Sequence, residues 1–142
     1  MTQKASVSFD AFLLSLTLTL SLAACTQSSM SFHEATGIDF ATAHIALAEY
    51  GESDGTGNYS TLSISEESLN EILSSVRLEH GKKQDAMPNQ FFFFHITLPD
   101  KETVELVFGD DGEIIVGNPD SRNFWKNADK TAFQQLMEYV SK

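Results

Sequence analysis

The chain has 142 residues, a hydrophobic content of 42% and a formal net charge of −11 at pH 7. That length is typical of one domain with one hydrophobic core, so no second domain is needed. The strong negative charge argues against nucleic acid as a partner, because phosphate binding needs a clustered basic face. For the same reason it disfavours a purely electrostatic attachment to anionic lipid.

The first predicted element is an apolar run over residues 11–24, which ends in small residues just before Cys25. Its length suits the hydrophobic region of a secretory signal and is short for a membrane-spanning helix. Cys25 is the only cysteine, so it cannot form an internal disulfide. The run therefore predicts a cleavable export signal over residues 1–24; a buried helix followed by an ordinary core thiol is the alternative.

The residues Leu22, Ala23, Ala24 and Cys25 resemble a bacterial lipobox, the motif of exported proteins whose cysteine is diacylated before the signal is removed. The resemblance implies a thioether-linked lipid on Cys25 and a mature chain that begins there. Acyl chains such as palmitate would provide about 0.8 kcal/mol of membrane affinity per buried methylene. The expected location is the extracytoplasmic face of the cell membrane, with membrane lipid as the first partner.

A short polar tether over residues 25–36 is expected to lead into a single α+β domain over residues 37–142. The domain should begin with a β-hairpin, because residues 45–50 and 59–64 alternate like strands around the glycine-rich stretch 51–57. That stretch carries several oxygen-bearing side chains. It lacks the first Asp and the last Glu of an EF-hand calcium loop, which favours a turn over a calcium site.

A helix is predicted next, because apolar residues recur at the spacing that lines one helix face. Ser65 suits the N-cap, and two glutamates follow it in the first turn. Gly81 marks the expected end of the helix. The apolar positions are Leu69, Ile72, Leu73 and Val76.

Three strands are then predicted over residues 91–98, 103–108 and 113–116, joined by short turns. In the second of these strands every other residue is apolar, which fits a sheet covered on one side. The pair Asp111-Gly112 is a strong hairpin signal. These strands should form a three-stranded antiparallel meander.

The last predicted element is a helix over residues 128–140, with Asn127 or Asp129 available as its cap. The order of elements predicts an α+β fold in which an antiparallel sheet, made of the hairpin and the meander, packs against two helices. Behind a lipobox, this organisation also resembles small uncharacterised surface lipoproteins of Gram-positive bacteria, over residues 37–140. That resemblance implies a surface domain of unassigned role and no functional residues.

Four consecutive phenylalanines, residues 91–94, place two rings on each face of the first meander strand. The run is either a central strand buried on both faces or, if one face is uncovered, part of an apolar patch with rings such as Tyr50 or Tyr59, as at partner sites. The stretch 118–125 is predicted as a polar loop, used either to plug the core with its tryptophan or for recognition. The candidate partner-binding residues are Phe91, Phe93, Arg122, Phe124 and Trp125.

Motifs for catalysis or metal binding are not found in the sequence: it has no HExxH, paired-cysteine or GxSxG pattern, and its four histidines stand far apart. The pair Glu66-Glu67 suits a helix start, and Asp110-Asp111 suits a solvated turn. We therefore expect no metal, no cofactor and no enzymatic activity.

The predicted function is a membrane-anchored module that binds a protein or an envelope component. The alternative is a small metal-dependent or hydrolytic accessory protein whose site forms only in the fold; a structural spacer is disfavoured, because it has little need of a compact domain.

Overall fold

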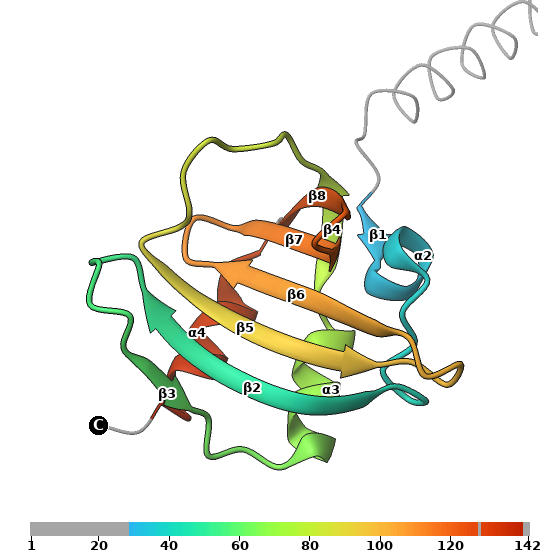
Figure 1. Ribbon diagram of the computed structural model, residues 1–142. Coiled ribbons are helices and arrows are strands. Elements are labelled where there is room, and N and C mark those ends of the chain that lie inside the picture. The colour runs from blue at the N-terminus through green and yellow to red at the C-terminus, as the bar shows by residue number, and fades with distance from the viewer. Residues whose placement is uncertain (1–28, 128, 141–142) are drawn as a thin grey trace, which may run out of the picture.

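Residues 29–127 and 129–140, which the computed structural model describes, form an antiparallel sheet of eight strands together with three helices (Figure 1). The strand order is β1-β4-β8-β7-β6-β5-β2-β3. The predicted export signal, the lipobox and Cys25 lie outside the described residues. The strands are β1 (Met30–Ser31), β2 (His44–Glu52), β3 (Tyr59–Thr61), β4 (Arg77–His80), β5 (Gln90–Thr97), β6 (Thr103–Gly109), β7 (Glu113–Asn118) and β8 (Ser121–Asn127), and the helices are α2 (Phe32–Thr36), α3 (Glu66–Ser74) and α4 (Thr131–Met137).

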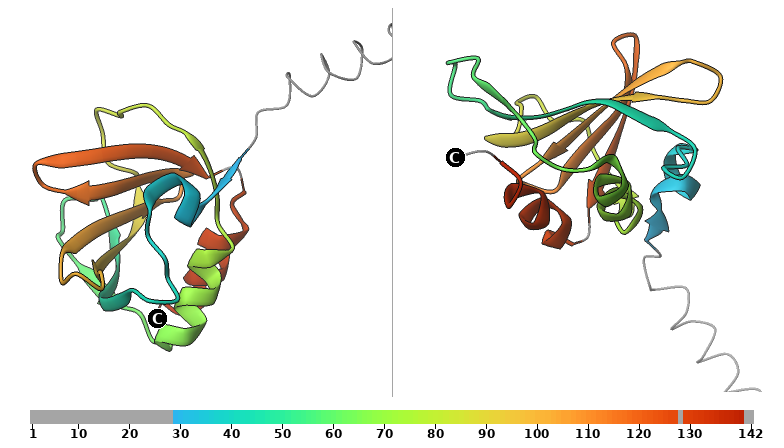
Figure 2. Two further views of the ribbon diagram at one scale, coloured as in Figure 1. Left: turned by 90° about the vertical axis from the view of Figure 1, so that its right-hand side faces the viewer. Right: turned by 90° about the horizontal axis from the view of Figure 1, so that it is seen from below.

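The helices gather on one side of the sheet. Helices α3 and α4 lie under it, and α2 lies beside α3 near the edge formed by β1 and β4 (Figure 2). We call the opposite side of the sheet the open face, because no helix of the described residues covers it (Figures 1 and 2). The α+β class and the antiparallel sheet with helices on one face are therefore confirmed.

The core fills the space between the sheet and the helices. Phe92 and Phe94 of β5 are fully buried there, and the Phe92 ring lies 4.9 Å from the ring of Phe133 in α4. Leu73 of α3 and Leu136 of α4 are also buried. Because successive side chains of a strand point to opposite faces, every ring sent into this core leaves its neighbour on the open face.

Several predicted elements are confirmed. The hairpin of β2 and β3 and the meander of β5, β6 and β7 pair as expected. The Ser65 side chain caps α3 by accepting a hydrogen bond from the Ser68 N–H at 3.2 Å. Gly112 adopts a φ of 89° in the turn before β7, a conformation that favours glycine.

The predicted helix after Ser65 is wrong in its second half. Helix α3 ends at Ser74, and Arg77–His80 forms β4, which pairs with β8. Val76 and Leu78 are both buried, and their two-residue spacing is that of a strand. Val76 continues the helical spacing of the apolar residues in α3. The chain nevertheless leaves the helix there, because pairing with β8 favours an extended backbone.

The predicted loop over residues 118–125 is also wrong, because most of it is β8. The Asn118 side chain accepts hydrogen bonds from the N–H groups of Asp120 and Ser121, which closes a tight turn. Strand β8 then pairs along the whole of β7. The meander therefore has four strands, and Arg122, Phe124 and Trp125 lie on a strand.

The first strand and helix of the described residues begin before residue 37. Strand β1 and helix α2 lie inside the range predicted as a tether, and Phe32 is buried against Phe40. The Ser31 side chain accepts from the Glu34 N–H while the Glu34 carboxylate accepts from the Ser31 N–H, a capping box that starts α2. The sheet also packs against three helices of the described residues, not two.

The last helix is shorter than predicted. It covers Thr131–Met137, and Lys130 occupies the N-cap position without a side-chain cap. Asp129, one of the two expected caps, directly precedes Lys130. Its side chain accepts a hydrogen bond from the Thr131 N–H. The buried residues Phe133 and Leu136 still provide the contact with the sheet.

Candidate functional site

A row of side chains crosses the centre of the open face on five adjacent strands. The register places Glu49 of β2 opposite Phe93, and it continues through β6, β7 and β8. Directly opposite residues in a sheet hold their side chains in contact distance. The row is Glu49, Phe93, Val107, Ile115 and Phe124.

A second row lies beside it at the end of β2. Gly51 has no side chain, and the Tyr59 ring from β3 occupies the space that one would fill. The Tyr59 ring meets the Phe91 ring edge to face, with 6.1 Å between the centroids. This close approach places the Tyr59 ring against the centre of the sheet.

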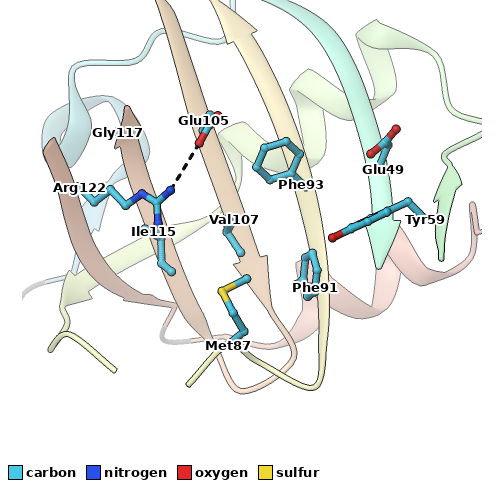
Figure 3. A pocket seen from close by; sticks show the side chains of 10 residues that line it. All are labelled: Glu49, Tyr59, Met87, Phe91, Phe93, Glu105, Val107, Ile115, Gly117 and Arg122. Atoms are coloured by element: carbon cyan, nitrogen blue, oxygen red, sulfur yellow. Dashed lines mark ion pairs between the residues drawn. The ribbon is translucent and has the colours of Figure 1, made fainter. Parts of the chain in front are cut away.

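Between and around these rows lies a hollow of about 300 Å³ (Figure 3). Its floor is made of side chains from the central strands, mostly apolar, and its rim carries Tyr59 and Met87. These two are the large hydrophobic side chains that the described residues leave most exposed, at 57% and 49%. The lining residues are Glu49, Tyr59, Met87, Phe91, Phe93, Glu105, Val107, Ile115, Gly117 and Arg122.

Hydrogen bonds from Ser53 join the two loops that border the hollow. The Ser53 N–H donates to the Asn89 carbonyl at 2.8 Å, and its hydroxyl donates to the Pro88 carbonyl at 2.6 Å. The loop before β5, which carries Met87, is thereby held beside the hairpin loop that leads to Tyr59. The rim is built by sequence segments about thirty residues apart.

The charges of the hollow are distributed unevenly. Arg122 Nη2 lies 3.8 Å from Glu105 Oε2 (Figure 3). On the other side of the same carboxylate, His95 Nε2 lies 3.9 Å from Glu105 Oε1. Glu105 thus has a cationic partner at its end of the hollow. The half-buried Glu49 stands at the other end, and its carboxylate has no ion pair or side-chain hydrogen bond among the described residues.

The structure brings most of the predicted partner-binding residues together. Phe91, Phe93 and Arg122 line the hollow, and Phe124 continues the central row beside it. Neither alternative for residues 91–94 describes the strand fully. Phe93 is partly exposed on the open face, whereas Phe91 on the same face is buried beside the Tyr59 ring. Sequence reasoning missed Glu49, Met87 and Ile115. Glu105 and Val107 also line the hollow. The sequence pattern had placed both on the second face of the predicted strand over residues 103–108, without naming them as site residues.

Trp125 does not belong to this group. It lies opposite the fully buried Ile114 and stacks on His80 at 5.1 Å, on the helical side of the sheet. The alternative in which Trp125 closes the end of the core fits this position. Tyr50 also points into the core, where burial and then its hydrogen bond to Glu52 raise its pKa to about 12.

The histidines and carboxylates are spread over the fold. His44 pairs with Glu66, whereas His95 lies near Glu105. No group of three His, Cys, Asp or Glu side chains that could hold a metal ion occurs within residues 29–127 and 129–140. In the loop compared with a calcium site, the Asp54 carboxylate accepts hydrogen bonds from Thr56 of the same turn.

A second cavity lies at the start of β7. There Glu113 is buried, and neither of its carboxyl oxygens has a hydrogen-bond partner in the described part of the chain. Burial raises the pKa of Glu113, and the nearby Asp111 carboxylate raises it further. Lys82, Gln84 and Lys126 also line this cavity.

Comparisons of the chain with protein-family models, curated proteins and solved structures found no match. Among the described helices, none has the length and apolar character required to cross a membrane.

Proposed function

We propose that this protein is a lipid-anchored, extracytoplasmic binding module, non-enzymatic, that holds an apolar group of a partner in the hollow of the open face. The observation that carries the proposal is the position of Tyr59 and Met87, the most exposed large hydrophobic side chains of the described residues, on the rim of one apolar hollow. Exposed apolar surface of this kind marks interaction sites, because leaving it in water is unfavourable.

The residues around the hollow are types that contribute strongly to binding. Aromatic and Arg side chains dominate the energy of protein interfaces, and the hollow contains Phe91, Phe93, Tyr59 and Arg122. Met87 adds a flexible, polarisable side chain that adapts its shape to what it contacts. Phe93 and Val107 are held in place by the paired strands beneath them, so little ordering is needed on binding.

The proposed anchor and the hollow are compatible in space. The described chain begins at Ser29, just before β1, on the side of the sheet where the helices lie (Figure 2). Cys25 stands four residues before Ser29, and four extended residues span at most about 14 Å. A lipid on Cys25 would therefore keep the domain close to the membrane while the open face is on the other side of the sheet.

In-cell photocrosslinking tests the binding proposal. A photoreactive p-benzoylphenylalanine replaces Tyr59, which it resembles in shape, or Met87, and the matched control position is Glu138, which is exposed on the helical side. We expect the same crosslinked product from positions 59 and 87 and none from position 138. Phe93→Ser, introduced into the position-59 variant, should abolish that product while the folded chain persists.

Two outcomes would contradict the binding proposal. One is a set of crosslinks that is equally abundant at position 138. The other is a product from position 59 that persists when Phe93→Ser removes the central ring. Thermal unfolding followed by circular dichroism shows whether each variant remains folded, and Val107→Ser provides a second variant of the hollow floor.

A further inference from the structure

The two ends of the hollow differ in the charge they offer. At the β8 end, Arg122 lies 3.8 Å from the Glu105 carboxylate, so the two charges balance. At the β2 end, Glu49 is partly buried as a residue, and its carboxylate has no ion pair or side-chain hydrogen bond among the described residues. Glu49 therefore leaves one unpaired negative charge at this end of the hollow, and such a charge attracts a cation.

Aromatic rings flank the free carboxylate. Figure 3 shows the Glu49 side chain near both Phe93 and Tyr59, and all three residues line the hollow. An ammonium or guanidinium group that approaches Glu49 would also lie near these rings, and cations are attracted to aromatic faces. The net charge of −11 acts in the same direction over longer distances.

The size of the hollow favours a side chain over a larger free molecule. Its volume of about 300 Å³ is at the lower limit of small-molecule pockets, which span roughly 300–1,000 Å³. The floor around Val107 is apolar, and Met87 on the rim can adjust to one inserted group. One large apolar side chain of a protein partner fits this description.

The strand spacing indicates how the apolar and cationic groups must be arranged. Glu49 and Val107 lie two strands apart, and adjacent strands are about 4.8 Å apart. In an extended segment, side chains on one face recur every second residue, about 6.7 Å apart. A lysine or arginine two positions from the apolar residue would therefore reach Glu49, whereas an immediate neighbour would point away from the sheet.

We propose, on the basis of the function proposed above, that the hollow binds an extended segment of a partner protein in which a large apolar side chain enters the hollow and a lysine or arginine two positions away pairs with Glu49. The proposed ligand class is thus a basic, apolar peptide segment. Acidic segments are excluded by the same carboxylate.

The test uses the full chain in nanodiscs of phosphatidylcholine, a lipid without net charge, so that basic peptides do not bind the bilayer electrostatically. A phage-displayed library of random heptapeptides is selected on these nanodiscs, after depletion on empty ones. We expect enrichment of a large apolar residue with Lys or Arg two positions away. Fluorescence anisotropy with a dye-labelled selected peptide then measures the dissociation constant.

Matched variants separate charge from packing. Glu49→Gln should raise the dissociation constant of the selected peptide about fivefold. This is the effect of losing a partly exposed ion pair worth roughly 1 kcal/mol. Glu138→Gln, which removes an equal charge on the helical side, should leave the affinity unchanged. Glu49→Lys should reverse the preference, so that the same peptide with Glu in place of its basic residue binds more tightly than the original.

The outcomes distinguish this inference from the proposed function. Enriched peptides without a basic residue, or equal affinity of wild type and Glu49→Gln, would overturn the inference while crosslinks at position 59 still support a binding module. The inference also fails if the photocrosslinked product contains lipid or a small molecule and no protein. An absence of both crosslinks and enriched peptides would overturn the two proposals together.

Discussion

The ring of Tyr59 lies directly over Gly51. A Cβ atom placed on Gly51 would come within 2.8 Å of two Tyr59 ring carbons and 2.9 Å of the Phe91 ring. The backbone of Gly51 does not require a positive φ, so this glycine is needed for the space it leaves. Because Gly51 has no side chain, the exposed Tyr59 ring can reach the hollow.

Gly51→Ala should therefore displace Tyr59 from the rim. We expect a loss of about 1–3 kcal/mol in the free energy of unfolding, the usual cost of inserting a methyl group into a close contact. Denaturant-induced unfolding measures this loss. The crosslink from position 59 should decrease in the same variant, and an unchanged yield together with unchanged stability would contradict the arrangement.

Glu66 protects the exposed part of β2. Its carboxylate accepts a hydrogen bond from the Ile45 N–H at 2.9 Å and lies 2.8 Å from His44 Nδ1. The hydrogen bond from Ile45, and then the contact with His44, lower the pKa of Glu66. Unpaired strand edges invite pairing with other chains, so a carboxylate placed on the backbone N–H also blocks that edge.

The stability contributed by Glu66 should depend on pH. Because its pKa is lower in the folded protein than its ordinary value of 4.5, the contribution is present above pH 4.5 and is lost as the pH falls through the folded pKa. Glu66→Gln should reduce the free energy of unfolding at pH 7 by less than about 1 kcal/mol, since the pair is exposed. Urea unfolding of both proteins from pH 7 to pH 3 should show this difference disappearing at the acidic end; a constant difference would contradict it.

Glu113 should show the opposite behaviour. Its pKa is raised by burial and by Asp111, so the folded state prefers the protonated acid. The contribution of Glu113 to stability is then most favourable at low pH and declines as the pH rises above the ordinary value of 4.5. Glu113→Gln, which removes the buried charge, should stabilise the protein at pH 7 by roughly 1 kcal/mol.

Thermal unfolding at pH 7 and pH 4 measures this effect. The melting temperature of Glu113→Gln should exceed that of the wild type at pH 7, and the advantage should shrink at pH 4. Asp120→Gln is a suitable control, because Asp120 is an exposed carboxylate in the turn before β8. A lower melting temperature for Glu113→Gln at pH 7 would show that the carboxylate has a favourable partner.

Cys25→Ala tests the proposed lipid anchor. Without the thiol no thioether can form, so we expect the chain to leave the membrane fraction or to retain residues 1–24. Fractionation of cells and mass spectrometry of the amino terminus measure both results. A normally processed chain that stays with the membrane in the absence of Cys25 would refute the anchor.

Local sequence patterns predicted the elements that are stabilised by local interactions. The Ser65 cap, the turn at Gly112 and the alternation of β6 depend on residues a few positions apart, and each was predicted correctly. Strand β4 was missed because it depends on pairing with β8, and β8 was missed because it depends on pairing with β7 and β4. Arg77–His80 follows helical apolar residues directly, and β8 is mostly polar, so neither stretch shows its pairing in isolation.

The candidate site was predicted in part for a related reason. The four phenylalanines showed that one face of β5 would carry two rings outside the core, but the sequence could not show which strands continue that face. The pairing of β2 and β5 brings Glu49 beside Phe93 from more than forty residues away. The two roles considered for Trp125, closing the core or recognition, could not be separated while the stretch was predicted as a loop, because only its place on β8 shows which face the side chain is on.

The pairing of β1 has a mechanical consequence. Within the described part of the chain, Met30 and Ser31 form strand pairs with only Leu78 and Arg77 of β4, and the Arg77 guanidinium donates a hydrogen bond to the Ser29 carbonyl. Tension applied through the amino-terminal side of the chain would load these few bonds first, followed by the buried ring of Phe32 in α2. The central strands that form the floor of the hollow are joined by longer ladders on the other side of β4. If the chain is anchored at Cys25 as proposed, a pull on the anchor would thus detach β1 and α2 from the sheet before it deformed the hollow.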